Sequence, residues 1–348
     1  MKNISHFFLS SNSPRGFYSK FDELKKLNYR VIKGCPGCGK STMMKKILEF
    51  TSDSSYELIH CSSDPSSLDA IILKNQKICF ADGTSPHEFD PELPGFCGNM
   101  INLCKFKSNV NILKNESKIL SLNNEYKKLQ YRAQKYLMSF GAIFSDSLES
   151  IIEKINFDKI EKLASSISNK IFSKKLSKIP TESIRFIRSI GPLGVFSFLN
   201  NFKNYKKVYE INDDFFIVSD LLLKFIKKQA LKFGYNTILC VSPITLNERI
   251  EAIIFPELKI AIFLSNTFEP NDSNIKTQKI DISSCYISDI KHSSYNLKIE
   301  KSLINETIKT MKKSKKIHNQ IEDIYKNLID FDYVNKVTEN ILDEINKK

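Results

Sequence analysis

Nine consecutive residues near the amino terminus carry two patterns that could each do chemistry. They read GCPGCGKST: Gly34, Cys35, Pro36, Gly37, Cys38, Gly39, Lys40, Ser41 and Thr42. The frame G-x-x-x-x-G-K-[ST] is the Walker A pattern of a loop that wraps a nucleotide phosphate. The inner C-x-x-C spacing is used for zinc and for thiol redox chemistry. The elements that position these residues decide between the two.

The flanking segments favour phosphate binding. Residues 29–33, YRVIK, indicate a short strand, and residues 41–50 place apolar side chains on one side of a helix. In this order the bare N–H groups of the loop converge on an anion, and glycine lets the backbone approach phosphate oxygens. Lys40 then supplies a charge to the β and γ phosphates, and the Ser41 hydroxyl ligates Mg²⁺. We therefore expect all nine residues to bind ATP together with Mg²⁺.

The C-x-x-C spacing lacks the second pair of ligands that a structural zinc site takes. Cys35 and Cys38 are therefore interpreted as fillers at variable loop positions, with a redox-sensing thiol of lowered pKa as the alternative hypothesis. The remaining cysteines are single, and several lie in apolar runs, which is typical of reduced, buried thiols in a cytoplasmic protein. They are Cys61, Cys79, Cys97, Cys104, Cys240 and Cys285.

A magnesium nucleotide site also needs an acidic residue at the end of a neighbouring buried strand. Asp82 directly follows the apolar run ICFA, residues 78–81. We predict that Ser41 and Asp82 hold the metal, with Asp82 orienting a metal-bound water. The alternative is an aspartate that only starts a turn.

Three residues are predicted to act on the phosphates or on the attacking group: Lys40, Asp64 and His87. Asp64 follows the second predicted strand, where it either polarises a water or acceptor hydroxyl or caps a following helix. His87 lies with Glu88 and Asp90 on a proline-rich loop just after Asp82. These loop residues either recognise an acceptor or only solvate the loop.

Two arginines and one helical segment are further candidates. Arg15 and Arg132 could neutralise charge in the transition state, although a surface position is the commoner fate of an arginine. Residues 113–140 predict long, charged helices, which suit either a lid that excludes water or a motor arm.

The chain contains an internal repeat at an offset of 178–182 residues. Residues 6–21 match residues 184–199, and residues 67–84 match residues 249–266. We predict two tandem domains, residues 1–178 with the intact phosphate loop and residues 179–348 as a degenerate repeat. Alternating strands and helices predict an α/β fold, with two P-loop NTPase-like domains that each have a mainly parallel sheet flanked by helices. A charged helical insertion ends each half.

The second half has no counterpart of the phosphate loop. The glycines and the lysine of the loop have no counterparts in the equivalent segment, residues 208–225, and Leu264 replaces Asp82. Asp213 and Asp214 stand where a phosphate would bind, and like charges repel. We predict that this half binds no nucleotide in this manner.

Taken together, the chain resembles a little-characterised bacterial family of P-loop ATPases and nucleotide kinase-like proteins built from two tandem copies of one domain. The resemblance runs almost end to end. It implies ATP binding and the fold but not the substrate. Many relatives look to have a phosphate loop in both copies, so the second half departs from the pattern. Four segments carry the resemblance: SPRGF (13–17), IKGCPGCGKSTMMKKI (32–47), IHCSSDPSSLDAII (59–72) and DGTSPHEFDPELPG (82–95).

Composition narrows the choice of partners. The net charge is +13, but only six of the 52 basic residues are arginine. The densest lysine run, residues 309–316, lies in a segment whose apolar residues have helical spacing. A solvated helix face explains this better than nucleic-acid binding. No run approaches the roughly 18 apolar residues of a membrane span, and the first residues lack the features of a secretory signal. We expect a cytoplasmic protein without membrane or nucleic-acid partners.

The favoured function is an Mg-ATP-binding P-loop NTPase. It would hydrolyse ATP or transfer the γ-phosphate to an unknown small-molecule acceptor. The alternative is a slow nucleotide-dependent switch or scaffold whose degenerate half binds a partner protein. The sequence does not decide between water and a hydroxyl as the attacking group.

Overall fold

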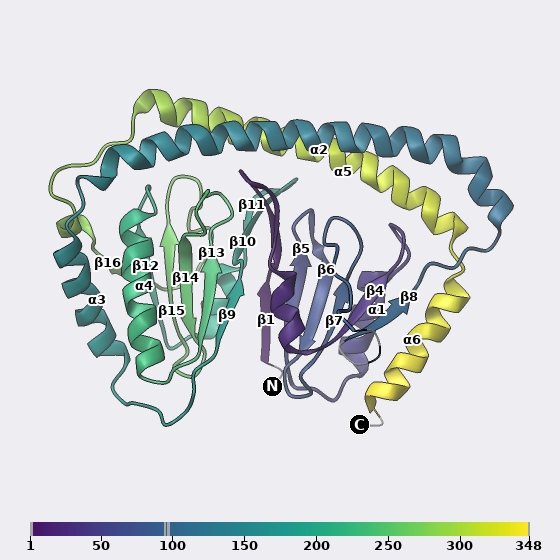
Figure 1. Ribbon diagram of the computed structural model, residues 1–348, viewed down its shortest axis with the longest axis horizontal. Coiled ribbons are helices and arrows are strands. Elements are labelled where there is room, and N and C mark those ends of the chain that lie inside the picture. The colour runs from purple at the N-terminus through teal and green to yellow at the C-terminus, as the bar shows by residue number, and fades with distance from the viewer. Residues whose placement is uncertain (1–2, 94, 96–97, 347–348) are drawn as a thin grey trace.

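The apolar runs of the first half form a six-stranded sheet (Figure 1). The structure, a computed structural model, describes residues 3–93, 95 and 98–346. The order across the sheet is β1 (Asn3–Phe7), β5 (Ser55–Cys61), β6 (Asp64–Leu73), β7 (Ile78–Asp82), β4 (Asn28–Lys33) and β8 (Asn99–Asn102). The same half of the chain also contains the hairpin β2 (Ser10–Ser13) and β3 (Gly16–Ser19), the 3-10 helix η1 (Phe21–Lys26), and the helices α1 (Lys40–Phe50), α2 (Asn109–Ile152) and α3 (Phe157–Ile171).

The second half forms a sheet with the same order of corresponding strands. Across it lie β9 (Glu182–Arg185), β13 (Thr237–Val241), β14 (Ile250–Phe255), β15 (Ile260–Ser265), β12 (Lys207–Asn212) and β16 (Gln278–Ile280). The same half of the chain also contains β10 (Arg188–Gly191), β11 (Gly194–Ser197), η2 (Leu199–Asn204), α4 (Ile217–Lys232), η3 (Ser283–Cys285), α5 (Ser294–Leu328) and α6 (Phe331–Asn346). The protein is thus α/β, with two sheets flanked by helices.

Both sheets are mixed but mainly parallel, because one strand in each sheet runs against the other five. β6 runs antiparallel to both β5 and β7, and β14 runs antiparallel to both β13 and β15. The reason lies in the short turn between β5 and β6, because so short a connection can join only antiparallel strands. Of the two alternatives for Asp64, the cap of a following helix is therefore wrong, since Asp64 begins strand β6.

The two sheets share a core. Side chains along a strand point to opposite faces in turn, so neighbouring residues of β6 pack in different places. Ile71 packs with α1 and α6. Ala70 packs in a second core, which also contains Ala252 and Phe263 of the other half. A backbone bridge between Phe8 and Phe186 adds to this contact.

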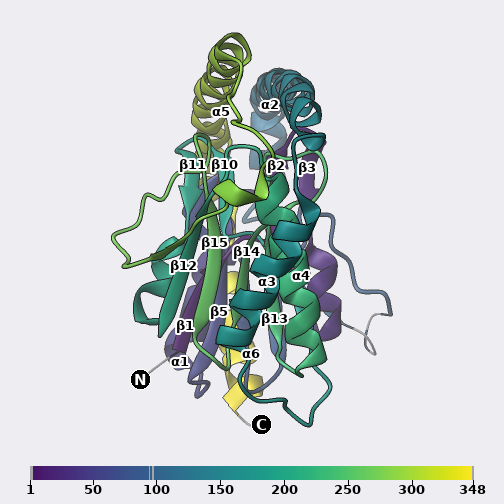
Figure 2. The ribbon, with the colours of Figure 1, turned by 90° about the vertical axis from the view of Figure 1, so that its left-hand side faces the viewer.

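Each half sends its last two helices across to the other half. α2 has 44 residues, which at ~1.5 Å per residue is enough to cross both sheets. It lies antiparallel to α5 over the sheets (Figures 1 and 2). α3 then packs on α4 of the second half, and α6 packs on α1 of the first. The division at residue 178 stays a prediction, and neither half contains all the helices that cover its own sheet.

Ion pairs hold the crossed helices in place. Arg30 of β4 is 4% exposed and donates from its two terminal nitrogens to the two carboxylate oxygens of Glu344 on α6, at 2.8 and 2.6 Å. A hydrogen bond to a charged group contributes about 1.5–3 kcal/mol. This fork therefore fixes α6 against the strand that leads into the phosphate loop.

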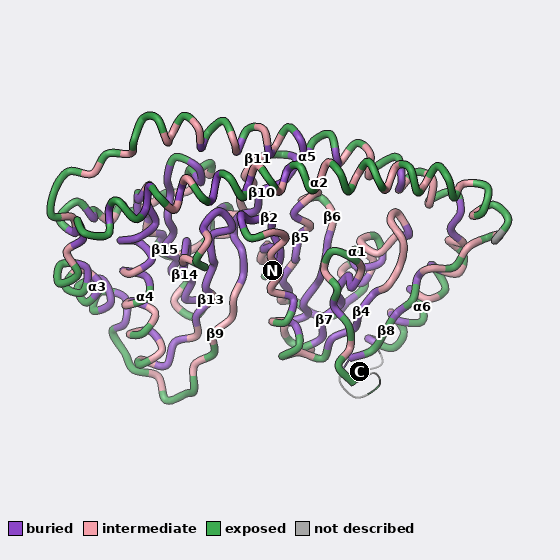
Figure 3. The backbone as a smooth tube through the Cα atoms, turned by 45° about the horizontal axis from the view of Figure 1, so that its top comes forward, coloured by how far each residue is buried: buried purple, intermediate pink, exposed green. Residues whose placement is uncertain are grey.

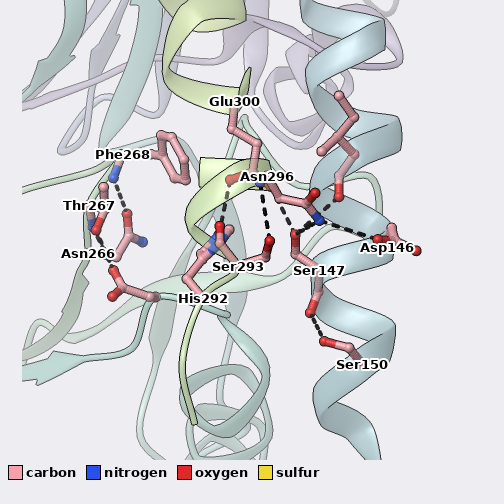
Figure 4. Close-up of polar contacts among 12 residues, drawn as sticks. Asp146, Ser147, Ser150, Asn266, Thr267, Phe268, His292, Ser293, Asn296 and Glu300 are labelled. Atoms are coloured by element: carbon pink, nitrogen blue, oxygen red, sulfur yellow. Dashed lines mark hydrogen bonds and ion pairs between the residues drawn. The ribbon is translucent and has the colours of Figure 1, made fainter. Parts of the chain in front are cut away.

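A polar junction fixes α2 to α5 over the second half (Figure 4). Ser147 of α2 donates to Glu300 of α5 at 3.0 Å, and His292 Nε2 lies 3.0 Å from the other oxygen of Glu300. Asn296 donates to Asp146 and to Ser147. Because Glu300 is fully buried, these contacts lock one relative position of the two helices.

The faces of α2 and α5 that point away from the sheets are exposed, and the faces that point toward the sheets are buried (Figure 3). This is the pattern of amphipathic helices that cover a domain. Among the described residues, no helix is long and apolar enough to cross a membrane.

The exchange of helices makes a prediction about fragments. Residues 1–178 and 179–348, expressed separately, should each fail to fold cooperatively, because each lacks the helix that packs on its own sheet. Expressed together, they should form a one-to-one complex. Circular dichroism, thermal unfolding and size-exclusion chromatography measure both outcomes. A cooperative unfolding transition of fragment 1–178 alone would contradict the exchange.

Candidate functional site

The phosphate loop joins the carboxyl end of β4 to the first turn of α1. Gly37 and Gly39 have φ angles of 72° and 94°, in the left-handed region that favours glycine. Helix α1 begins at Lys40 with no side-chain cap on its first turn and no acidic residue in it. Its first N–H groups have no intrahelical acceptor, so they are available to an anion.

Lys40 folds back over this loop. Its Nζ donates to the carbonyl oxygens of Gly34 at 3.0 Å and Cys35 at 3.2 Å, and it lies 3.6 Å from Asp82 Oδ2. The Lys40 side chain is 13% exposed. Its charge is therefore held beside the free amides, where a phosphate could replace the two carbonyls.

Asp82 lies directly beside the loop, because β7 pairs in parallel with β4 and puts Asp82 opposite Ile32. Its Oδ1 accepts hydrogen bonds from the amide of Thr84 at 2.9 Å and from its hydroxyl at 2.6 Å. Burial raises the pKa of Asp82, and Lys40 and Thr84 oppose that effect. Oδ2, which faces Lys40, is the oxygen placed to meet a cation.

The residues around Lys40 fit the oxygen chemistry that Mg²⁺ prefers. The Ser41 hydroxyl accepts a hydrogen bond from the amide of Leu68 at 3.0 Å, which holds it at the start of α1. Asp82 Oδ2 lies 3.6 Å from Lys40 Nζ. The described residues include no group of three or more His, Cys, Asp or Glu that could hold a metal ion. A hydroxyl and a single carboxylate are oxygen ligands of the kind that Mg²⁺ takes beside phosphates and water.

His87 lies in a buried pair with Asp69. Its Nε2 is 3.2 Å from Asp69 Oδ2, and its ring stacks on Phe21 with centroids 4.5 Å apart. Burial lowers the pKa of His87, but Asp69 and Asp82 outweigh it and raise the pKa above 6.5. With its side chain 7% exposed, His87 is placed to position Asp69 and the loop rather than to meet an acceptor.

Asp69 was missed in the sequence analysis. It is the one acidic residue in the otherwise apolar run LDAIIL of β6, and it is 4% exposed. A single charge inside a buried strand requires a partner and was the signal that could have found it.

Asp64 is more accessible than the two buried carboxylates of this region. Its side chain is 37% exposed, compared with 13% for Asp82 and 6% for Asp69. Ser66 donates to Asp64 Oδ1, and Lys315 Nζ of α5 lies 3.3 Å from Oδ2. Burial tends to raise the pKa of Asp64, but Ser66 and Lys315 lower it, so the group is a carboxylate at neutral pH.

The other predicted residues form contacts of their own. Asp90 lies 2.6 Å from Lys33 Nζ at the end of β4. Arg15 lies 3.8 Å from Glu248 and covers the ring of Tyr18. Arg132 is an exposed residue of α2, and Glu88 is an exposed residue with a φ of 39°. The structure therefore brings Asp90 toward the loop and engages Arg15 with the second half.

The two thiols of the loop differ. Cys38 is 1% exposed, and its pKa falls to about 7, because a hydrogen bond with Cys35 and the charge of Lys40 outweigh burial. The same hydrogen bond and burial raise the pKa of Cys35. The lowered pKa fits the redox alternative chemically, whereas the burial of Cys38 opposes reaction. The described cysteines are free thiols, and Cys97 lies outside the described residues.

In the second half, a carboxylate occupies the position of the anion. Asp213 Oδ2 accepts from the amide of Ser219 at 2.8 Å, and Oδ1 accepts from Phe215 at 3.1 Å and from the Tyr286 hydroxyl at 3.1 Å. Asp213 is 3% exposed. Helix α4 is thus already capped from within the chain, which supports the prediction that no phosphate binds there.

A cavity of about 470 Å³ opens beside this cap rather than beside the phosphate loop. Its charged lining residues are Asp213, Asp214, Asp281 and Lys279. The excess of acidic groups disfavours an anionic ligand. The cavity therefore gives no reason to assign a nucleotide to the second half.

Comparison with known proteins found a similarity in the first half. Residues 14–89, about a fifth of the chain, match the family described as Novel STAND NTPase 3. This segment contains the loop, Asp69, Asp82 and His87. No curated protein and no solved structure matches the chain. The similarity indicates an NTPase-related family, whereas the tandem repeat and the kinase-like activity of the resemblance stay predictions.

The His87–Asp69 pair predicts a pH dependence of stability. A histidine whose pKa is raised on folding stabilises the protein below its unfolded value, and the effect is lost as pH rises through the folded value. The free energy of unfolding of wild type should therefore exceed that of His87→Gln by more at about pH 6 than at about pH 9. Urea titrations at both pH values measure this. An equal difference at both would show that His87 is neutral when folded.

Proposed function

We propose that the first half binds Mg-ATP at residues 34–42 and cleaves its terminal phosphate bond. One observation carries this proposal. Helix α1 has an uncapped first turn beside Lys40 and Asp82, whereas the equivalent α4 is capped by Asp213. The same fold thus leaves one anion position free and fills the other. The similarity to an NTPase family over the same segment supports the assignment.

The chain's own groups account for binding. The N–H groups of residues 37–42 hold phosphate oxygens at the positive end of α1. Lys40 exchanges its bonds to the carbonyls of Gly34 and Cys35 for the β and γ phosphates. Ser41 and Asp82 would hold Mg²⁺. When bound, Mg²⁺ neutralises charge on the phosphates.

The attacking group is placed by acidic residues at the start of β6 and the end of β7. Asp64 has the exposure needed to meet a water or an acceptor hydroxyl. Asp69 and His87 hold the loop after β7 in position. We favour water as the acceptor, with a small-molecule hydroxyl as the other possible acceptor.

A second candidate function is a slow nucleotide-dependent switch whose degenerate half binds a partner protein. It is favoured by the contact of the loop with the crossed helices. A Cβ atom on Gly37 would lie 3.0 Å from the carbonyl oxygen of Glu322 in α5, and one on Gly39 would lie 3.7 Å from Val334 of α6. Nucleotide binding would therefore act directly on the helices that join the halves.

Substitution of the loop lysine tests the proposed site. Lys40→Ala should lower the rate of phosphate release from Mg-ATP by roughly 10²-fold or more, because it removes a charge from the transition state. It should also weaken binding of a fluorescent ATP analogue. Lys45→Ala, which removes the same charge from an exposed position of the same helix, is the matched control. Wild-type affinity and turnover in Lys40→Ala would refute the site.

The capped second half makes a prediction about stoichiometry. Isothermal titration of wild type with Mg-ADP should give one site per chain, and Lys40→Ala should remove that site. Two sites per chain would mean that Asp213 leaves α4 and that the second half is a working nucleotide domain.

A further inference from the structure

Helix α5 of the second half passes over the phosphate loop of the first. Lys315 Nζ lies 3.3 Å from Asp64, and the backbone of Glu322 contacts Gly37. Between them, His318 lies close enough to Lys40 and Asp64 for both charges to act on it. Residues of α5 therefore line one side of the site, from the end of β5 to the loop.

Helix α2 provides an internal comparison for the part of α5 that passes over the phosphate loop. α2 crosses the second half as α5 crosses the first. The bridges Phe106–Ile329 and Ile155–Tyr286 join the start of each long helix to the end of the other. Helices α3 and α6 then begin with the same dipeptide, Phe-Asp, at residues 157 and 331. An offset of 174 residues therefore aligns the last turns of α2 with those of α5.

Under this alignment, buried positions of α2 correspond to buried positions of α5 until α5 reaches the candidate nucleotide site. Ala133, Leu137 and Phe140 are buried, and so are their counterparts Thr307, Met311 and Ser314. The next positions differ in chemistry. The stretch is Gly141, Phe144 and Leu148 in α2, and Lys315, His318 and Glu322 in α5.

The polarity of each helix segment matches the polarity of the residues beneath it. Gly141 lies beside Leu246, since a Cβ placed on it would be 3.6 Å from Leu246 Cδ2, and Phe144 packs edge-on against Phe216 of the capped turn. Leu246 is the counterpart of Asp64 at the 182-residue offset of the repeat. The polar stretch thus faces the open anion position and the apolar stretch faces the filled one.

We propose that Lys315 is a nucleotide-contacting residue that the second half supplies to the terminal phosphate bound by the first. This rests on the proposed function. Among the described residues, Lys315 forms one ion pair, with the partly exposed Asp64, and its side chain is 23% exposed. A terminal phosphate carries more negative charge than one carboxylate and competes for the ammonium group. Arg15 is paired with Glu248 and contacts Tyr18, so its charge is already engaged elsewhere.

The proposal gives α5 a defined role. Lys315 leaves Asp64 when the terminal phosphate is present and returns after cleavage. Asp64 is then free to orient the attacking water while Lys315 offsets the charge that develops on the phosphate. Cleavage would therefore require both halves, although only one binds the nucleotide.

A transition-state analogue tests this separately from nucleotide binding. Mg-ADP with aluminium fluoride places an analogue of the transferred group next to the β phosphate. Lys315→Met should keep the Mg-ADP affinity of wild type within about threefold and lose about 10²-fold or more in single-turnover cleavage. Aluminium fluoride should slow the release of Mg-ADP from wild type, and Lys315→Met should lose this effect. Lys316→Met, at the exposed next position, is the matched control and should behave as wild type.

The outcomes separate the two proposals. If wild type binds no Mg-ADP, the proposed function and this inference both fail. If wild type binds Mg-ADP and cleaves ATP, but Lys315→Met matches Lys316→Met in both the cleavage rate and the slow release of Mg-ADP with aluminium fluoride, only the inference fails. Thermal unfolding checks that the variants fold, and Lys315→Gln is judged by the same criteria should Lys315→Met not fold. Lys315→Arg, which keeps the charge, should retain more cleavage than Lys315→Met.

Discussion

The first turn of helix α1 is the feature on which the rest of the account depends. Amide groups at the start of a helix need an acceptor, and burying them without one costs free energy. The chain satisfies this need in α4 with the carboxylate of Asp213, whereas it leaves α1 without a side-chain cap and sets Lys40 beside it. The same structural element is therefore closed in one half and open to an anion in the other.

The exchange of helices links this local difference to the whole molecule. α5 and α6 belong to the second half, yet they contact the phosphate loop and the sheet of the first. Arg30 and Glu344 tie α6 to the strand that enters the loop. A change at the loop must therefore act on the contact between the halves. The second half therefore has a structural role at the loop, because it supplies helices that contact it.

The sequence predicted the elements of the site better than their surroundings. The strand, loop and helix around Lys40, the strand ending at Asp82 and the α/β class were predictable, because they depend on local patterns. The antiparallel β6 was missed because its polar start, DPSS, resembles a helix cap. Asp69 was missed because a lone aspartate in an apolar run gains meaning only from a distant partner, His87. The position of Lys315 over Asp64 depends on the path of a helix 250 residues away, which no local pattern specifies.

Backbone amide chemical shifts test the central claim most directly. In a deuterated, ¹⁵N-labelled sample titrated with Mg-ADP, the amide protons of Gly39, Lys40, Ser41 and Thr42 should move downfield as they donate to phosphate oxygens. The amides of Phe215 and Ser219, which already donate to Asp213, should keep their shifts. Unchanged shifts at residues 39–42 in the presence of saturating Mg-ADP would contradict the account, as would changes centred on Phe215 and Ser219.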